Sequence, residues 1–462
     1  MAEETPSEKM RLSRKRFIGG IAGAGMGLGI AGVLAACGGT KSSTGATEEA
    51  APTTAAGEQT AAKGKPLVIG SAYPLTTSDG AEMKGGSNLA VAEINASGGV
   101  AGREIVHDPI LDFNNFDGAS VTDAFNKLVS AEVDAVILGY HNVMDPNTIL
   151  AAYGAPFLNA STSTDQVAQL RSDPAKFANI FQVDPTEAAY GLGFPAFLDN
   201  LIAQGTFTPP KRTIHIFEGD IPYSTSISKN AQTAAAKDDP PWEIVGVEPI
   251  AGTGGPVTDW TPQIAKVKDS GATVTFNTHW NPADHAALMK QWAADPPDSF
   301  LYLQYGASVP EFLELAGDAA NGVVWATVLG VYNDAVAKAF QDRYMAKWGK
   351  VAGFSNSGTG YDEVNMLARM WGKTGDPKDF KANVAALRSM IHRGVAGGYW
   401  FEHDPDINYC LSYPSEIADP SLGNAHEFFQ ILPDDSGNLQ HLVISPAPYV
   451  QTPYVKQPWL SF

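Results

Sequence analysis

From residue 65 onward, short β-rich runs alternate with segments of helical periodicity, an order that leaves few fold classes open. The expected strands are residues 67–69, 104–112, 133–138, 156–159, 213–217, 244–250, 273–277, 300–303 and 323–327. Residues 120–131 carry apolar side chains at the spacing of one helix face: Val121, Ala124, Phe125, Leu128 and Val129. Strands and helices that alternate in this way predict βαβ units, and therefore parallel sheets covered by helices on both faces.

The alternating body is too long for one such sheet, because a single core stops growing near ~250–300 residues. The whole chain has 462 residues. We therefore expect an α/β protein with two Rossmann-like lobes and a ligand crevice between them, at the carboxyl ends of the strands. A single catalytic domain with large insertions is the alternative.

The composition argues against several classes of partner and cofactor. Acidic side chains number 50 against 31 basic ones, so the formal net charge is −19, which argues against nucleic acid as a partner. The two cysteines, Cys37 and Cys410, are too few for a disulfide framework or a thiolate metal site.

No recognisable catalytic motif occurs in the body. It contains no G-x-S-x-G elbow, no phosphate-binding G-x-x-x-x-G-K-[ST] loop and no H-E-x-x-H pair. The best metal-like cluster is residues 402–406 (EHDPD), which we interpret as a turn because Asp-Pro-Asp is an ordinary turn sequence. We therefore expect a protein that is not an enzyme and that uses no metal and no cofactor.

The N-terminal segment predicts export and a lipid anchor. Residues 1–36 hold a charged stretch followed by an uncharged, glycine-rich one, the pattern of a signal peptide. Residues 33–38 (VLAACG) resemble a bacterial lipobox, in which Cys37 carries the lipid; an incidental cysteine is the alternative. Residues 37–64 are mostly small and polar, as in a flexible tether. We expect an exported protein, lipid-anchored at the outer face of the cytoplasmic membrane or in the periplasm.

Several segments resemble type I periplasmic binding proteins, and in particular the leucine/isoleucine/valine-type receptors of ABC transporters. The segments are residues 70–76 (GSAYPLT), 89–103 (LAVAEINASGGVAGR), 133–139 (VDAVILG), 316–323 (AGDAANGV) and 361–364 (YDEV). The resemblance runs from about residue 65 to residue 405, and the residues after 405 fit only loosely.

This resemblance implies two lobes with parallel sheets joined by crossing strands. Residues 65–183 and 329–400 would form the first lobe, and residues 184–328 and 401–462 the second. A small-molecule ligand and the permease subunits of an ABC transporter are the implied partners.

The resemblance also implies that loops after the strands contact the ligand. Ser161, Thr162 and Ser163 lie at an expected helix start, where free N–H groups and the helix dipole can hold a carboxylate or carbonyl. A helix cap or turn is the alternative for these hydroxyls. His141 and Asn142 follow the preceding strand as their implied neighbours, with a satisfied loop histidine as the alternative.

Four aromatic residues are implied to line the cleft. Tyr223, Trp280 and Tyr305 follow strands of the second lobe, and Tyr361 lies near an expected helix start. Aromatic walls bury the apolar part of a ligand while their polar tips stay hydrogen-bonded. Packing in the core is the alternative for each of them.

One position departs from the family pattern. Where amino-acid receptors of this family place a carboxylate for the ammonium group of the ligand, our alignment puts Tyr305. A buried ammonium without a countercharge is costly. Asp79 can replace that carboxylate from the opposite lobe, and a turn before Gly80 is the alternative for it. Without a replacement acid, neutral amides, urea-like compounds and aromatic or short-chain carboxylates fit better.

Three functions compete at this point. The leading one is a lipid-anchored solute receptor that delivers an amino acid, an amide or a small carboxylate to an ABC importer. The second keeps the fold but makes it a sensor that reports the ligand to a partner receptor. The third is an amide hydrolase in the same cleft, against which stands the lack of a nucleophile with its base.

Overall fold

The computed structural model describes residues 64–251 and 255–462 of the chain. The predicted signal segment, Cys37 and the predicted tether up to residue 63 lie outside the described residues. None of the helices in these two ranges has the length and apolar character needed to cross a bilayer.

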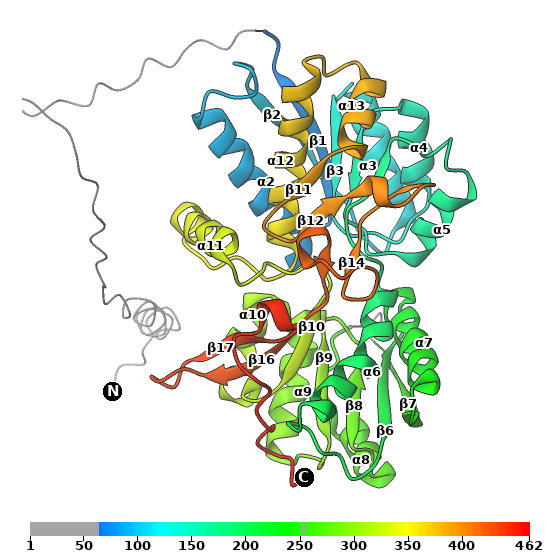
Figure 1. Cartoon of the computed structure of the whole chain (residues 1–462), viewed down its shortest axis with the longest axis vertical. Coiled ribbons are helices and arrows are strands. Elements are labelled where there is room, and N and C mark those ends of the chain that lie inside the picture. The colour runs from blue at the N-terminus through cyan, green and yellow to red at the C-terminus, as the bar shows by residue number, and fades with distance from the viewer. Residues whose placement is uncertain (1–63, 252–254) are drawn as a thin grey trace, which may run out of the picture. The chain divides into compact units, whose positions relative to one another are not determined.

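The first sheet has six strands in the order β13-β5-β4-β3-β1-β2, and every neighbouring pair is parallel. Figure 1 labels β1, β2 and β3 of this sheet. The strands are β1 (Leu67–Tyr73), β2 (Ile105–Asp112), β3 (Ala135–Leu138), β4 (Phe157–Asn159), β5 (Ile180–Gln182) and β13 (Asn408–Tyr409). The helices that follow them or pack nearby are α2 (Ser78–Ala96), α3 (Gly118–Ser130), α4 (Asp145–Tyr153), α5 (Thr164–Ser172), α11 (Ala335–Trp348), α12 (Asn356–Thr374) and α13 (Phe380–Arg388). Strand β3 is buried along its whole length, as expected for a parallel strand covered on both faces.

The second sheet has seven strands in the order β17-β16-β10-β9-β8-β6-β7. The strands are β6 (Thr213–Gly219), β7 (Glu243–Ile250), β8 (Val274–Asn277), β9 (Phe300–Gln304), β10 (Val324–Thr327), β16 (Glu427–Pro433) and β17 (Leu439–Ser445). Its helices are α6 (Ala188–Ala203), α7 (Pro222–Lys237), α8 (Thr261–Ser270), α9 (Pro282–Ala294) and α10 (Pro310–Ala316). Strands β16 and β17 pair antiparallel, in the region after residue 405 where the sequence predicted no strand.

Strand β9 shows how the second sheet is covered. Phe300 and Tyr302 pack in one apolar cluster with side chains of α6 and α7, whereas Leu301 and Leu303 pack in another with side chains of α8, α9 and α10. Successive side chains of a strand point to opposite faces, so both faces of this sheet carry helices. The prediction of an α/β protein with parallel sheets in two lobes is confirmed.

The chain passes between the two sheets three times, after β5, after β10 and after β13. The sequence placed the last change from the first lobe to the second at residue 401. In the structure it comes after β13, because β13 pairs with Phe181 and Gln182 of the first sheet. Two paired residues give no periodic signal, so only the tertiary structure assigns them. The remaining elements are β11 (Ile391–Arg393), β12 (Gly398–Trp400), β14 (Ser412–Tyr413), β15 (Asn424–Ala425), η2 (Tyr305–Ser308), η3 (Gly317–Ala320), η4 (Phe401–His403), η5 (Pro420–Leu422) and η6 (Ala447–Tyr449).

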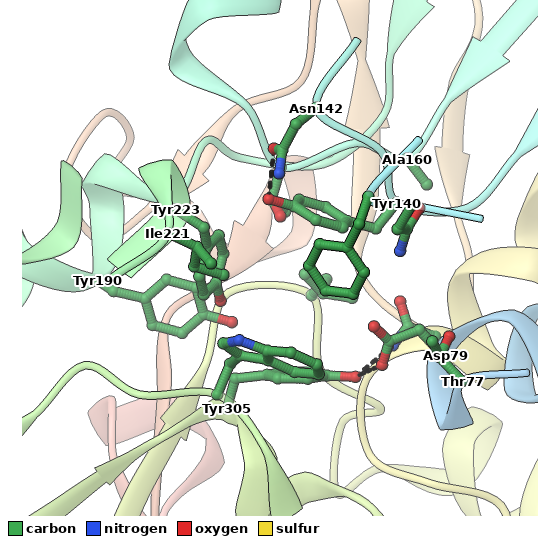
Figure 2. Close-up of a pocket in the computed structure, with 15 residues that line it drawn as sticks. Thr77, Asp79, Tyr140, Asn142, Ala160, Tyr190, Ile221, Tyr223 and Tyr305 are labelled. Atoms are coloured by element: carbon green, nitrogen blue, oxygen red, sulfur yellow. Dashed lines mark hydrogen bonds between the residues drawn. The ribbon is translucent and has the colours of Figure 1, made fainter. Parts of the chain in front are cut away.

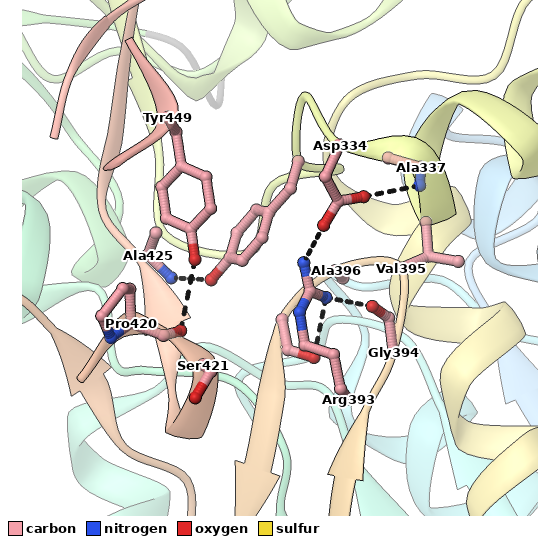
Figure 3. A network of polar contacts seen from close by, with 12 residues as sticks. Asp334, Ala337, Arg393, Gly394, Val395, Ala396, Pro420, Ser421, Ala425 and Tyr449 are labelled. Carbon is pink, nitrogen blue, oxygen red and sulfur yellow. Dashed lines mark hydrogen bonds and ion pairs between the residues drawn. The ribbon is translucent and has the colours of Figure 1, made fainter. Parts of the chain in front are cut away.

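Polar side chains tie the second and third crossings together (Figure 3). The Arg393 guanidinium pairs with Asp334 and donates to the carbonyl oxygen of Gly397 at 3.2 Å. It also lies 4.5 Å from the centre of the Tyr332 ring. The Tyr332 hydroxyl accepts a hydrogen bond from the N–H of Ala425 on the third crossing. The two crossing segments are therefore joined to each other as well as to the lobes.

Candidate functional site

A cavity lies at the carboxyl ends of strands from both sheets (Figure 2). Fifteen residues line it, nearly all of them in segments that follow a strand: Thr77, Asp79, Asn115, Phe116, Tyr140, Asn142, Ala160, Thr162, Tyr190, Ile221, Tyr223, Trp280, Tyr305, Leu329 and Asn356. This is the edge at which parallel α/β sheets bind ligands, because loops of neighbouring strands meet there.

Six of the ten ligand contacts expected from the sequence line this cavity: Asp79, Asn142, Thr162, Tyr223, Trp280 and Tyr305. Four do not: His141, Ser161, Ser163 and Tyr361. That the six contact a ligand stays a prediction, and the four have other partners.

Asp79 and Tyr305 meet across the cavity. The Tyr305 hydroxyl donates a hydrogen bond to Oδ1 of Asp79, and the Asn356 side-chain amide donates to the Tyr305 oxygen at 2.8 Å. Asp79 lies in the first turn of α2, which begins after the N-cap Thr77, so it is part of a helix and not of a turn before Gly80. Helix α2 belongs to the first lobe and Tyr305 follows β9 of the second, so this contact joins the lobes.

The electrostatic surroundings of this pair are negative. Asp79 is half-buried at the cavity wall, and its removal from water raises the pKa of its carboxyl, an effect that the Tyr305 hydrogen bond partly offsets. Burial also raises the pKa of Tyr305 well above its usual value, and the charges of Asp79 and Glu82 add to that rise. Glu82 is buried one turn further along α2 and accepts a hydrogen bond from the N–H of Gly353 at 2.7 Å.

Aromatic rings form much of the remaining wall (Figure 2). Tyr223 lies edge-to-face with Tyr140 at 5.7 Å between ring centres and with Tyr190 at 6.3 Å. Phe116 and Trp280 form a second pair at 6.5 Å. The Phe116 side chain is 64% exposed, which places this ring at the open side of the cavity. Apolar surface of a ligand can therefore be covered from several directions.

The serine-rich loop after β4 is mostly engaged within the protein. The Ser161 hydroxyl accepts from the N–H of His141 and donates to its carbonyl oxygen, both at 2.8 Å. Ser163 is the N-cap of α5 and accepts from the N–H of Gln166 at 3.3 Å. The cap, given as the alternative for these hydroxyls, is what the structure shows for Ser163, and only Thr162 of the three faces the cavity.

His141 is a core residue. It is fully buried, its ring lies 5.7 Å from that of Phe125, and its Nδ1 accepts from the N–H of Val143. Burial lowers the pKa of His141 to about 3, so the ring is neutral at physiological pH. His141 is therefore engaged within the protein, as its alternative held, although its Nε2 has no hydrogen-bond partner among the described residues. The neighbouring Tyr140 lines the cavity in its place.

Tyr361 also faces away from the cavity. Its hydroxyl donates to Oε2 of Glu93 at 2.6 Å and accepts from Arg343 at 3.1 Å, so it belongs to a contact among α2, α11 and α12. Asn356, the first residue of α12, is the one that reaches the cavity. The family motif located this helix but placed its start at Tyr361, whereas α12 begins five residues earlier at Asn356. Tyr361 lies on another face of the helix.

Sequence reasoning missed nine of the lining residues. Asn115, Phe116, Tyr140 and Ile221 directly follow strands or begin the next helix, so their position after a strand was a usable signal. Leu329 comes from the crossing after β10, Asn356 from the first turn of α12 and Tyr190 from α6. No local pattern marks these three, because their place depends on how the lobes meet.

The EHDPD cluster is a turn. Asp404 accepts hydrogen bonds from the N–H groups of Asp406 and Ile407 at 3.0 and 3.1 Å, and pairs with Arg171 at 2.6 Å. Across residues 64–251 and 255–462, no group of three His, Cys, Asp or Glu side chains is arranged to hold a metal ion.

The fold and the cavity between two lobes define a type I periplasmic binding protein, and comparison with known proteins agrees. Residues 66–411 match the family described as periplasmic binding protein, and the chain belongs to this family. A solved structure, a putative branched-chain amino acid ABC transporter protein from Silicibacter pomeroyi, is 33% identical, with a TM-score of 0.77 over 86% of this chain and 100% of that one. The prediction that the chain is not an enzyme is confirmed by these relatives, which are solute-binding proteins.

More distant structures share the fold. The branched-chain amino acid binding protein LivJ from Streptococcus pneumoniae, solved with isoleucine, is 19% identical with a TM-score of 0.62, covering 82% of this chain and 100% of its own. A solute-binding protein from R. palustris, solved with benzoate, is 16% identical with a TM-score of 0.60, covering 85% and 99%. No curated protein matches the chain.

Proposed function

We propose that this protein is the extracytoplasmic substrate-binding subunit of an ABC importer, and that it closes on a small ligand in the cavity between its lobes. One observation carries the proposal. The cavity is lined from both lobes, and Asp79 of one lobe contacts Tyr305 of the other. A ligand held by both walls binds the closed arrangement better than an open one, and differential affinity of this kind shifts the population toward closure.

The crossings supply a hinge for this movement. Three segments connect the lobes. The Tyr332–Ala425 contact holds the second and third together, and the Arg393–Asp334 pair fixes the second to β11 (Figure 3). Closure about connecting segments of this kind moves each lobe as a body. The surface that the closed lobes present together is then what the permease subunits recognise.

The N-terminal residues support a lipid anchor. Cys37 lies in the lipobox-like run at the end of the signal-like segment, and residues 37–64 have the composition of a tether. An acyl chain at Cys37 would hold the body at the outer face of the cytoplasmic membrane. A net charge of −19 gives anionic lipid little attraction for the protein, so the anchor would be the lipid and not the surface charge.

Closure on a ligand is the property to test. Residues 65–462 would be screened by thermal unfolding against amino acids, amines, amides, urea and carboxylates, and each stabilising compound would be examined by X-ray scattering. A ligand present at a hundred times its Kd adds about 2.7 kcal/mol to the free energy of unfolding, which moves the midpoint measurably. We expect a stabilising compound that also reduces the radius of gyration. Stabilisation without compaction would contradict closure.

A further inference from the structure

We infer that the ligand of this cavity is a small organic cation, an amine or quaternary ammonium ion with an apolar body and no carboxylate. This inference rests on the proposed binding function and narrows it to one class of compound. It differs from the ligands expected from the sequence, which included amino acids, amides and carboxylates. Four features of the cavity carry it: an acid without a cationic partner in the lining, a negative surrounding field, a helix N-terminus already used by an acidic side chain, and an aromatic wall.

Asp79 is the only charged residue among the fifteen that line the cavity. None of them is Lys, Arg or His, and the groups that Asp79 contacts are the neutral Tyr305 hydroxyl and Asn356 amide. These hydrogen bonds and the start of α2 compensate only part of the hydration that the carboxylate has lost, because its pKa stays raised. A cationic ligand would supply that charge.

Two further carboxylates extend the negative field around the cavity. The charge of Glu82 acts on Tyr305, and the charge of Glu187 acts on Tyr140. Both glutamate side chains are buried. The pKa of Tyr140 is raised by burial, then by the charge of Glu187, and also by that of Asp79. Both tyrosines line the cavity, so a ligand between them meets negative potential from two directions.

The start of α5, where the family resemblance places a ligand carboxylate or carbonyl, already holds an acidic side chain of this protein. Helix α5 begins after the serine-rich loop, and the N–H of Thr164 in its first turn donates to Oε2 of Glu187 at 2.7 Å. In the same turn, the N–H of Gln166 donates to the Ser163 hydroxyl at 3.3 Å. A ligand carboxylate placed there would compete with Glu187 for the same positive helix end.

Six aromatic rings contribute to the wall: Phe116, Tyr140, Tyr190, Tyr223, Trp280 and Tyr305. The face of an aromatic ring attracts cations, and the effect grows where water is excluded. Oδ1 of Asn115 has no hydrogen-bond partner among the described residues and can accept from an ammonium N–H. Nε1 of Trp280 is likewise unpaired, but one neutral N–H does not hold a carboxylate against the nearby acids.

Compounds matched in shape and different in charge test the inference. Leucine and 3-methylbutylamine differ only in the carboxylate, and 4-methylpentanamide and 4-methylpentanoate give neutral and anionic counterparts of the amine. Phenylalanine, 2-phenylethylamine, 3-phenylpropanamide and 3-phenylpropanoate repeat the series with a ring, and phenyltrimethylammonium tests a quaternary head. Each would be titrated into the full chain in mild detergent by calorimetry, with tryptophan fluorescence as a second readout.

We expect at least one amine or the quaternary ion to bind on the order of a hundredfold more tightly than the amino acid and the carboxylate of its series. Asp79→Asn should remove most of that preference. Asp123→Asn, which changes the same charge at an exposed site on α3, should leave it unchanged. Retention of the preference in Asp79→Asn would overturn the role of this acid and with it the inference.

The receptor function and the assignment of a cationic ligand can be refuted separately. Binding of leucine, an amide or a carboxylate without binding of any amine would overturn the cation assignment and leave the receptor function standing. Absence of binding by every member of both series, together with no stabilisation by any compound of the wider screen, would overturn both.

Discussion

The Tyr305 hydroxyl donates a hydrogen bond to Oδ1 of Asp79, although the two residues lie 226 positions apart in the chain. Asp79 comes from the first turn of α2 in one lobe, and Tyr305 follows β9 in the other. The backbone of Tyr305 has a φ of 21°, a conformation that side-chain-bearing residues rarely adopt. Strained backbone of this kind persists where the surrounding structure imposes it, and here it directs the ring to the lobe interface.

Tyr305→Phe should favour the open arrangement. The variant loses a hydrogen bond to a charged group, which contributes about 1.5–3 kcal/mol in other proteins. We expect a larger radius of gyration in ligand-free solution and weaker binding of any cavity ligand, measured by X-ray scattering and calorimetry. Tyr153→Phe, which removes the 2.6 Å hydrogen bond to the Val133 carbonyl far from the cavity, is the matched control. Equal effects of the two variants would contradict the prediction.

Binding of an amine should weaken as the pH falls. Removal of Asp79 from water raises the pKa of its carboxyl, and burial also raises the pKa of the neighbouring Glu82. The ionised form of Asp79 attracts the cation, and a simple amine, with a pKa near that of lysine at about 10.4, stays charged throughout the acid range. The Kd of 3-methylbutylamine should therefore rise as the pH falls from 8 toward and through the raised pKa. In Asp79→Asn this pH dependence should largely disappear. Tighter binding of 3-methylbutylamine to the parent protein at acid pH would contradict the prediction.

Arg393→Ala should destabilise the hinge. The side chain pairs with Asp334, donates to two carbonyl oxygens and covers Tyr332, and it is only 27% exposed. Loss of these contacts should lower the free energy of unfolding by about 1–3 kcal/mol, seen as an earlier midpoint in urea. Lys127→Ala breaks a pair with Asp123 in which both side chains are more than 60% exposed, and should cost at most ~0.5 kcal/mol. Similar midpoints for the two variants would show that the Arg393 network contributes little.

Glu427→Gln should stabilise the protein increasingly as the pH rises. Glu427 is fully buried on β16, and neither carboxylate oxygen has a hydrogen-bond partner among the described residues. Burial raises its pKa well above the ordinary value, an effect that Arg393 partly offsets. The folded state thus keeps the proton after the unfolded chain has lost it near pH 4.3, so this group costs stability as the pH rises toward its folded pKa.

Each unit of pKa shift corresponds to about 1.4 kcal/mol, which sets the scale of the Glu427 effect. Calorimetric midpoints of parent and Glu427→Gln should be similar near pH 4 and diverge between pH 5 and 8, with the variant higher. A difference that stays constant over this range would mean that the substitution acts through packing and not through the charge.

Cys37→Ser should release the protein from the membrane. The lipobox-like sequence predicts that the Cys37 thiol carries the lipid, and serine offers no thiol for that bond. We expect the parent in the membrane fraction and the variant in the soluble fraction, with mass spectrometry reporting the lipid. Cys410→Ser is the control, because the Cys410 thiol is buried beside the first sheet and its loss should leave membrane association unchanged. Membrane association of Cys37→Ser would contradict the anchor.

The alternation of strands and helices up to β10, apart from β5, the parallel sheets and the family could be predicted from the sequence. Periodicity is a local property: residues 120–131 form a helical face on their own, and α3 spans nearly the same residues. The family motifs are local as well. They led to six residues that line the cavity, since most of its wall comes from loops directly after strands.

Only the tertiary structure decided which side chains in those loops face the cavity. Tyr140 and His141 are neighbours after β3, yet Tyr140 lines the cavity and His141 packs in the core, because the loop that follows β3 turns their side chains to different sides. The contact between Asp79 and Tyr305, the place of Asn356 and the internal use of α5 by Glu187 arise where separate segments meet. The charge of the cavity, and with it the class of ligand, is set by these long-range contacts, which no local pattern records.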